Sequence, residues 1–555
     1  MLRHGLVAGM LIALSSCSTQ APEGENDPFS FTESVTVFTA KKVYTGVSDN
    51  PVVSGVVVND SGRIVGLLPA DFEGEIRAVD SKVEFISLPD AYLYPGFVDA
   101  HIHLLGIGQR ELRLDLADIA SVTELVDRIQ GEVRDAEPDQ VIYGRGWIET
   151  GWPEDRMPLA TDLDEVSPNN PVILTRADGH ALVANTAALA AAAIDDETPD
   201  PDGGTIERNE GGIATGILID NAMEPVLDLV AEPTASDLVA AYAIGAQEYV
   251  SRGWTGGHNM SVDPSHAQLM ARLDAEDRMP LRVHNAFDIE GMDLAAARRF
   301  ETETITNRAV KLYMDGALGS RGALLLEPYS DRPGSIGLSL MEPDRLSEVM
   351  QTAQDRGVQL AIHAIGDLAN RRILDTFEQS GFGPELRWRI EHTQILHPDD
   401  IQRVADVGLV ASMQPSHAIG DLKFAPDRLG FRRLRGAYAW SSLIDAGAIV
   451  AGGSDAPVEV GSPLIEFYAA VARKDLAGNS GRGWRPEEAL TREQALALFT
   501  SAPAYASFQE EDLGTLEIGK IADLSAFDVD LMVAPEAEIL EAQAVLTVVN
   551  GQIVN

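Results

Sequence analysis

The chain has 555 residues but only one cysteine, comparatively few basic residues and no long apolar run beyond its N-terminal region. A single cysteine excludes an intrachain disulfide. Lys and Arg number 42 against 86 Asp and Glu, which gives a formal net charge of −44. So acidic a surface argues against nucleic acid as a partner and against charge-driven binding to an anionic membrane. Without a later apolar run of sufficient length, no transmembrane helix is expected beyond the N-terminal region.

The N-terminal region predicts export from the cytoplasm. Arg3 and His4 form a short basic start, and the apolar run from Gly5 to Leu14 is too short to span a membrane as a mature helix. This pattern is typical of a signal peptide, which we assign to residues 1–16.

The end of this segment, Leu14-Ser-Ser-Cys17, resembles a bacterial lipobox. The resemblance implies cleavage before Cys17 and lipidation of its thiol, and Ser18 in place of Asp favours the outer membrane. Residues 17–33 are polar and carry Pro and Gly, as expected of a flexible tether. We therefore expect an exported protein held on the periplasmic side, in contact with the membrane only through its lipid anchor. A plain secretory signal with an incidental cysteine is the alternative.

Both ends of the mature chain predict β-structure. Residues 34–95 contain short runs of strand-forming residues separated by turn sequences such as Asn59-Asp-Ser-Gly62. Residues 506–555 show the same pattern of strand-forming runs and turn sequences. We expect one small β-sandwich domain assembled from both termini.

The middle of the chain, residues 96–505, alternates predicted strands and helices. An α/β pattern with eight strands is typical of a (β/α)8, TIM-like barrel. A long gap between the first and second strands predicts an insertion at about 104–235, carried on the first βα loop. The eight expected strands are Gly96–His103, Thr255–Asn259, Leu281–Phe287, Ala309–Met314, Val358–His363, Trp388–His392, Leu409–Met413 and Ala448–Gly453.

Two histidines end the first barrel strand. His101 and His103 are spaced i, i+2, so their side chains point to the same side of the strand. Two converging imidazoles at a strand end can hold one divalent cation. A pair of hydrogen-bonded structural histidines is the alternative.

Other ligand-type residues lie on or at the end of later strands. Active sites in such barrels lie at the carboxyl ends of the strands. There the sequence places Lys311, His363, His392 and Asp455. An inward lysine is costly unless it is paired or chemically altered. Carboxylation by CO2 would turn it into an anionic carbamate that can bridge two cations.

With these residues in place, the chain resembles the amidohydrolase superfamily, and most closely the amidohydrolase-3 group that includes N-substituted formamide deformylases. The resemblance covers nearly the whole mature chain. It is carried by PGFVDAHIHL (95–104), GRGWIETGW (144–152), PVILTRADGHALVANTAAL (171–189), VKLYMDGALGSRGA (310–323), AIHAIGD (361–367), RIEHTQ (389–394), GGSDAPV (452–458) and GTLEIGKIADLSAFD (514–528).

The resemblance implies a metal centre. His101, His103 and Asp455 would bind one divalent ion, His363 and His392 a second, and carboxylated Lys311 would bridge them. Zinc is the default for such nitrogen and oxygen ligands, with one or two ions per chain. An unmodified lysine beside a single catalytic metal is the alternative.

The implied activity is hydrolysis of a non-peptide C–N bond in a small-molecule amide, formamide or related substrate. Metal-activated hydroxide would attack the carbonyl carbon, while Asp455 would take a proton and pass it to the departing nitrogen. A deaminase or a cyclic amide hydrolase on the same site is a second interpretation. A third is a catalytically inactive, surface-anchored binding or regulatory lipoprotein. The sequence also leaves open whether the chain forms a homo-oligomer.

The expected substrate contacts are Trp147, Arg176 and His180 in the insertion and Arg321 after the fourth barrel strand, each with loop stabilisation as its alternative. The insertion would act as a lid over the site. Four further candidate site residues lie near strand ends, and for each a hydrogen-bonded structural role is favoured over a functional one: His258, His284, His417 and Asp367.

Overall fold

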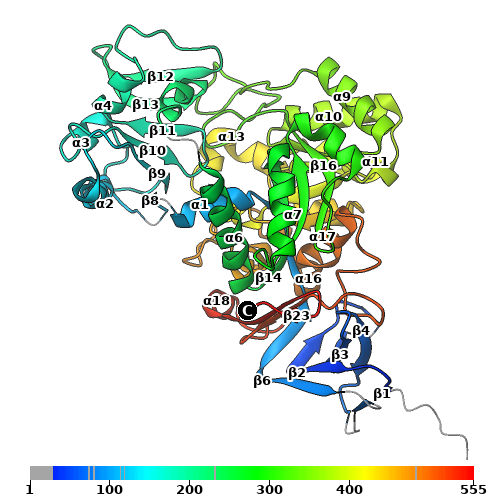
Figure 1. Ribbon diagram of the computed structural model, residues 1–555. Coiled ribbons are helices and arrows are strands. Elements are labelled where there is room, and N and C mark those ends of the chain that lie inside the picture. The colour runs from blue at the N-terminus through cyan, green and yellow to red at the C-terminus, as the bar shows by residue number, and fades with distance from the viewer. Residues whose placement is uncertain are drawn as a thin grey trace, which may run out of the picture.

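The structure is a computed structural model that describes residues 29–49, 51–72, 76–78, 82–112, 114–117, 119–230, 233–481 and 484–555 (Figure 1). The predicted signal peptide, Cys17 and the first part of the tether lie outside these residues. In the described part of the chain, no helix has both the length and the apolar character needed to cross a bilayer.

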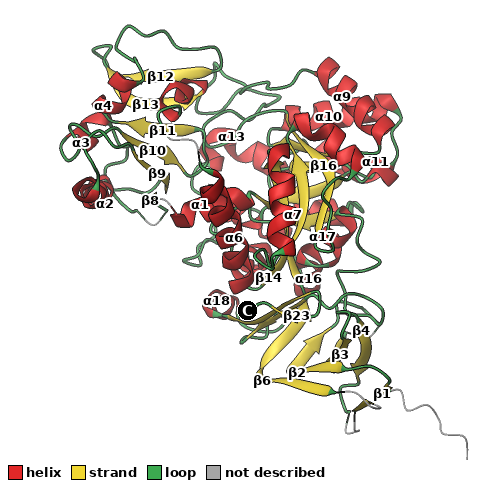
Figure 2. Cartoon of the chain, viewed as in Figure 1, coloured by secondary structure: helices red, strands yellow, loops and turns green. Residues whose placement is uncertain are grey.

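Eight parallel strands form the central barrel (Figure 2). Their order in the sheet follows their order along the chain, and Ile102 and Ala456 form a parallel bridge between the two ends of the sheet. The predicted TIM-like barrel is confirmed, and each observed strand overlaps its predicted range. The strands are β7 (Phe97–Ile102), β14 (Trp254–Val262), β15 (Arg282–Phe287), β16 (Ile305–Tyr313), β17 (Gln359–Ala364), β18 (Arg389–His392), β19 (Val410–Met413) and β20 (Val450–Gly452).

Helices connect the barrel strands and cover their outer face, and local sequence sets their limits. The first long helix begins at a capping box between Thr234 and Asp237. Three others end at Gly357, Gly381 and Gly408, each in the left-handed conformation that glycine adopts without strain. Helices of this layer include α6 (Ala235–Ser251), α7 (Ala267–Ala275), α9 (Pro343–Arg356), α10 (Asp367–Ser380), α11 (Ile401–Val407), α15 (Pro463–Ala472) and α16 (Arg492–Phe499).

Further helices complete the barrel and the terminal region. They are α1 (Leu104–Leu112), α8 (Met292–Ala297), α12 (Pro415–Asp421), α13 (Ala425–Arg433), α14 (Trp440–Asp445), α17 (Ser501–Ala506) and α18 (Glu536–Glu541).

Strands from both ends of the chain pair in one seven-stranded sheet, in the order β23-β22-β21-β6-β2-β3-β4. The long strand β6 joins the two halves, because it pairs with N-terminal β2 on one edge and C-terminal β21 on the other. A two-stranded sheet, β1 with β5, lies beside this sheet. The strands are β1 (Ser30–Phe31), β2 (Val35–Tyr44), β3 (Val52–Asn59), β4 (Ile64–Leu68), β5 (Arg77–Ala78), β6 (Val83–Pro95), β21 (Leu524–Phe527), β22 (Ala544–Val549) and β23 (Gln552–Ile553).

Two contacts fasten this terminal sheet to the amino end of the barrel. Phe97 of β7 packs edge-on against Phe527 of β21, with ring centroids 5.4 Å apart. Arg282 of β15 forms a bidentate ion pair with Asp523, at 2.7 and 3.1 Å, and both side chains are buried. The carboxyl end of the barrel lies opposite this attachment, so the terminal sheet does not cover the loops that follow the strands.

The insertion between β7 and β14 folds into its own lobe around a six-stranded mixed sheet, at the upper left of Figure 1. Separate apolar clusters cover its two faces. Its strands are β8 (Leu114–Asp115), β9 (Ile142–Trp147), β10 (Val172–Arg176), β11 (Ala181–Ala184), β12 (Gly204–Arg208) and β13 (Ala214–Asp220), and its helices are α2 (Val122–Asp135), α3 (Ala160–Asp164), α4 (Thr186–Ala191) and α5 (Glu224–Leu227).

Candidate metal centre and active site

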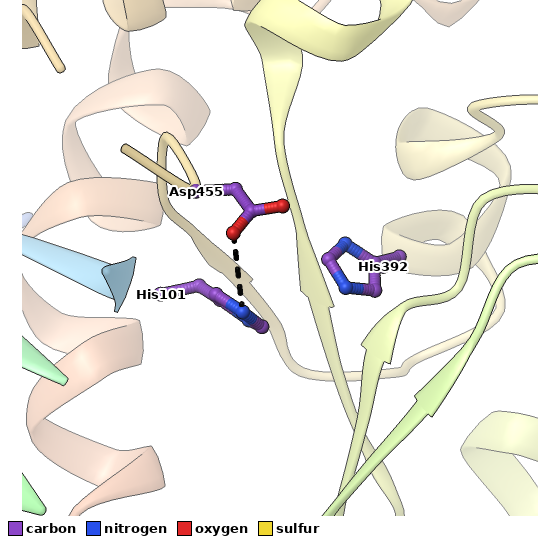
Figure 3. Close-up of side chains that lie close together, drawn as sticks. All are labelled: His101, His392 and Asp455. Atoms are coloured by element: carbon purple, nitrogen blue, oxygen red, sulfur yellow. Dashed lines mark ion pairs between the residues drawn. The ribbon is translucent and has the colours of Figure 1, made fainter. Parts of the chain in front are cut away.

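The sequence-predicted metal ligands lie close together at the carboxyl ends of the barrel strands. His101 and Asp455 face each other from opposite ends of the sheet, with Nε2 and Oδ1 3.5 Å apart (Figure 3). Nε2 of His103 lies 3.1 Å from the same oxygen. Lys311 of β16 brings its Nζ to 3.3 Å from Nε2 of His101. Three separate chain segments therefore present nitrogen and oxygen atoms to one space.

The remaining two histidines complete this cluster. The rings of His363 and His392 lie 4.6 Å apart, and the ring of His392 lies 4.8 Å from that of His101. His101, His392 and Asp455 offer ligand atoms that all lie within 4.8 Å of one another. The two groups of ligands that the sequence analysis separates are thus neighbours in one cluster.

Burial sets the protonation of these imidazoles. It lowers the pKa of His101 to about 4, and the pKa values of His363 and His392 also lie well below the usual range because burial disfavours the charged ring. Neutral imidazole is the form that binds a metal.

A buried carboxylate orients His101. Nδ1 of His101 lies 2.7 Å from Oε2 of Glu391, and both side chains are fully buried. Because a carboxylate only accepts, Nδ1 carries the hydrogen and Nε2 keeps its lone pair toward Asp455 and Lys311. Arg389 holds Glu391 in place, with its Nε 2.7 Å from Oε1. Metal-binding histidines commonly have such a carboxylate partner.

The sequence analysis missed this role of Glu391, although a signal for it is present. Arg389 and Glu391 are charged residues at i, i+2 on a strand that is otherwise buried, and this spacing places them on one face of β18. His392 has a comparable partner, since its Nδ1 lies 2.8 Å from Oε1 of Gln414.

Several buried polar atoms of the cluster have no hydrogen-bond partner among the described residues: Nε2 of His363, Nε2 of His417 and Oδ1 of Asp455. Buried polar atoms are nearly always paired. Unpaired imidazole nitrogens beside a carboxylate oxygen are the donor set that divalent transition metals prefer, so these residues fit a bound cation. His417, expected to be structural, lines the cavity here with Nε2 3.6 Å from Oδ2 of Asp455.

The three other residues expected to be structural have hydrogen-bond partners that fit that role. Nδ1 of His258 lies 2.6 Å from a guanidinium nitrogen of Arg389. Both ring nitrogens of His284 have partners, Thr306 at 2.8 Å and Gln359 at 3.1 Å. Asp367 accepts a bond from the backbone N–H of Leu326 at 2.8 Å.

The cluster lies in a cavity of about 830 Å³ between the barrel and the insertion. All six predicted ligands line it, together with Arg145, Arg176 and His180 of the insertion and Phe424 and Glu459 of barrel loops. A cavity of this size suits a small-molecule substrate.

The expected substrate contacts differ in where the structure places them, and Trp147 does not line the cavity. Its indole is fully buried in the core of the insertion, and its N–H donates to the carbonyl of Leu174 at 2.9 Å. A large apolar ring on a strand is drawn into the apolar core that this sheet covers, away from the cavity.

The charged candidates are largely occupied by protein partners. Arg176 lines the cavity but is ion-paired with Glu149 at 2.8 Å and with Asp178. His180 also lines it, with Nδ1 2.9 Å from Oδ1 of Asp220. Arg321 pairs with Asp331 at 2.8 Å and lines a neighbouring cavity of about 420 Å³ instead.

Comparison with known proteins agrees with this architecture. A profile of the amidohydrolase family matches residues 84–555. The chain belongs to the amidohydrolase family. The N-substituted formamide deformylase of Arthrobacter pascens is 30% identical over 507 residues, which cover 86% of this chain and 91% of that protein. Protein LONG AFTER FAR-RED 3 of Arabidopsis thaliana is 33% identical over 502 residues, 87% of this chain and 85% of that one.

Among solved structures, an uncharacterized metal-dependent hydrolase from Pyrococcus horikoshii superposes with a TM-score of 0.72 at 28% identity. The match covers 90% of this chain and 99% of that one. The family expected from the sequence is therefore confirmed.

Proposed function

We propose that this amidohydrolase is a metal-dependent hydrolase that cleaves non-peptide C–N bonds in small amides, formamides or related compounds. The observation that carries the proposal is the meeting of His101, His392 and Asp455 within 4.8 Å, inside a cavity closed on one side by the insertion. Similarity to a formamide deformylase and to a metal-dependent hydrolase supports the same reading.

The proposed ligands are His101, His103 and Asp455 for one divalent ion, and His363 and His392 for a second, with Lys311 between them. When bound, such an ion, zinc by preference, supplies Lewis acidity and lowers the pKa of water. The chain itself supplies the orientation: Glu391 fixes the tautomer of His101, and Gln414 restrains His392.

Asp455 is the proposed proton carrier. Its carboxylate follows β20 and reaches the centre of the cluster, where Oδ1 lies 3.1 Å from Nε2 of His103 and 3.5 Å from Nε2 of His101. A carboxylate at this position accepts a proton from the attacking water and delivers it to the departing nitrogen. The insertion lies over the cavity and limits the access of bulk water.

Lys311 is the proposed carbamate. Burial lowers the pKa of its amine to about 8, and only a neutral amine reacts with CO2. An ammonium beside two cations would be strongly unfavourable, whereas a carbamate is an anionic ligand. Its Nζ, 3.3 Å from Nε2 of His101, is already among the other ligands.

The test combines metal content with turnover. Purified protein is measured by inductively coupled plasma mass spectrometry and assayed with N-formyl and N-acetyl amines, before and after chelation. About two ions per chain and chelator-sensitive release of the amine are expected. Release of ammonia from amidine-like substrates would favour the deaminase reading, and a metal-free, inactive protein would favour the binding lipoprotein.

We further propose that the protein is exported and anchored to the outer membrane through Cys17. The support comes from the sequence alone: a basic start, a short apolar run and the segment Leu14-Ser-Ser-Cys17.

A further inference from the structure

The metal cavity contains an arginine that has no carboxylate partner in the described part of the chain. Arg145 lies on β9 of the insertion and lines the cavity. One of its terminal nitrogens donates to the carbonyl of Ala177 at 3.0 Å. Its Nε is buried and has no hydrogen-bond partner among the described residues. Arg176 and Arg321 differ from it, because each is neutralised by an acidic side chain.

The loop that follows β10 is shaped around this guanidinium. Gly179 adopts a φ of +74°, and a Cβ at that position would lie 3.2 Å from a terminal nitrogen of Arg145. A side chain there would therefore crowd the guanidinium as well as strain the backbone. The carbonyl of Ala177 fixes one end of the planar group, so the remaining N–H groups are held in a set direction.

A half-buried guanidinium without a counter-ion is unfavourable unless a ligand neutralises it. Glu459, an acidic residue that lines both of the cavities that Arg145 lines, does not do so. Burial, together with Asp421 and Asp455, raises its pKa to about 8, which leaves the carboxyl largely neutral at pH 7. No ion pair within 4.0 Å joins it to Arg145 among the interactions of the described residues.

Arg145 also marks a junction. It lines both the metal cavity and an adjoining cavity of about 390 Å³, and Pro457, Val458 and Glu459 are shared by the two. A ligand whose reacting bond lies at the histidine cluster therefore has room to extend past the guanidinium.

We propose that Arg145 binds an acidic group, a carboxylate, on the substrate, so that the compound cleaved at the metal cluster is an anionic amide rather than a neutral one. This inference takes the reaction from the proposed function. The negative charge of the substrate is inferred from Arg145 alone. A planar guanidinium binds a carboxylate with two parallel hydrogen bonds, which gives direction as well as affinity.

The test uses two matched pairs of compounds with the full metal-loaded protein. For binding, 3-phenylpropanoate is compared with 3-phenylpropan-1-ol by calorimetry. For turnover, N-formylphenylalanine is compared with N-formylphenethylamine. A charge-assisted contact should favour each carboxylate by about 10- to 100-fold. Arg145→Met should abolish that preference and leave affinity for the alcohol unchanged, whereas Arg145→Lys should retain part of it.

Lys423→Met is the matched control. Lys423 is another cationic residue that lines the cavity, but it is exposed to solvent. This variant should keep the preference, which separates direct contact from a general charge effect. Absence of a preference in the wild type, or its survival in Arg145→Met because the carboxylate binds the metal instead, overturns the proposal. If the preference holds but no formamide is cleaved, the proposed reaction fails and the anion site stands.

Discussion

Replacement of Glu391 by Gln tests whether the buried carboxylate serves the metal centre. The variant keeps the shape of the side chain but removes its charge. A Gln can present its carbonyl oxygen to His101 or to Arg389, and its NH2 group then faces the other donor. Breaking one partner of a buried ion pair costs about 3–5 kcal/mol. Arg389 keeps bonds to the carbonyl of Ala100 at 2.6 Å and to Ser412 at 2.9 Å, so we expect about 3 kcal/mol.

Metal affinity should fall as well, because the partner of a ligating histidine typically contributes about 10- to 100-fold. The loss of folding stability is measured by urea unfolding of chelator-treated protein. The loss of zinc affinity is measured by competition with a chromogenic zinc chelator. Asp523→Asn is the matched control. It breaks the equally buried Arg282–Asp523 ion pair at the opposite end of the barrel, where no predicted ligand lies. This control should lose stability and keep its zinc affinity. Wild-type zinc affinity in Glu391→Gln, or an equal loss in both variants, would refute the orienting role.

Three further outcomes follow from the proposed function. Asp455→Asn should lower turnover by on the order of 10² or more while metal content falls less, and near wild-type turnover would end its role as proton carrier. Lys311→Ala should lose metal and activity together and recover both in part when short carboxylic acids are added. Lys311→Arg should not recover, because guanidinium forms no carbamate. Crystallographic density for a bare Lys311 amine beside one metal would contradict the carbamate. Cys17→Ala should abolish acyl labelling and release the protein from membranes, and unchanged partitioning in cell fractionation would remove the case for a lipid anchor.

The barrel could be predicted because its signals are local. Several of the eight strands, such as Val410–Met413 and Val450–Gly452, are short and largely apolar, and a helical pattern follows most of the eight. The internal order of the insertion could not be predicted in the same way. Its strand β10 stands out as Pro171-Val-Ile-Leu-Thr175, but β12 and β13 lie in a polar, Gly-rich stretch whose pairing depends on contacts with β11. Such pairing follows from tertiary packing rather than from periodicity.

The ligand cluster was also accessible from the sequence, since histidines at successive strand ends must converge once the strands form a barrel. What spacing could not provide was the grouping of these residues. The resemblance gives His392 to the second ion of a bridged pair and His101 and Asp455 to the first, and the three residues lie within 4.8 Å of one another. Opposite ends of the sheet meet when the barrel closes, and that closure places His101 of β7 and Asp455 after β20 near His392 at the end of β18.

The substrate contacts could not be predicted from residue type alone. Arg145, Arg176 and Arg321 all lie in family-like motifs, and the sequence analysis chose the last two. The structure gives each of those a carboxylate from its own chain, Glu149 and Asp331, and leaves Arg145 without one. A guanidinium that already has a counter-ion gains little from a second anion, whereas an unpaired one gains charge neutralisation and hydrogen bonds together. We therefore infer the substrate contact from the absence of a counter-ion on the charged side chain rather than from its place in a motif. On that basis Arg145 is the residue through which this cavity would recognise an acidic substrate.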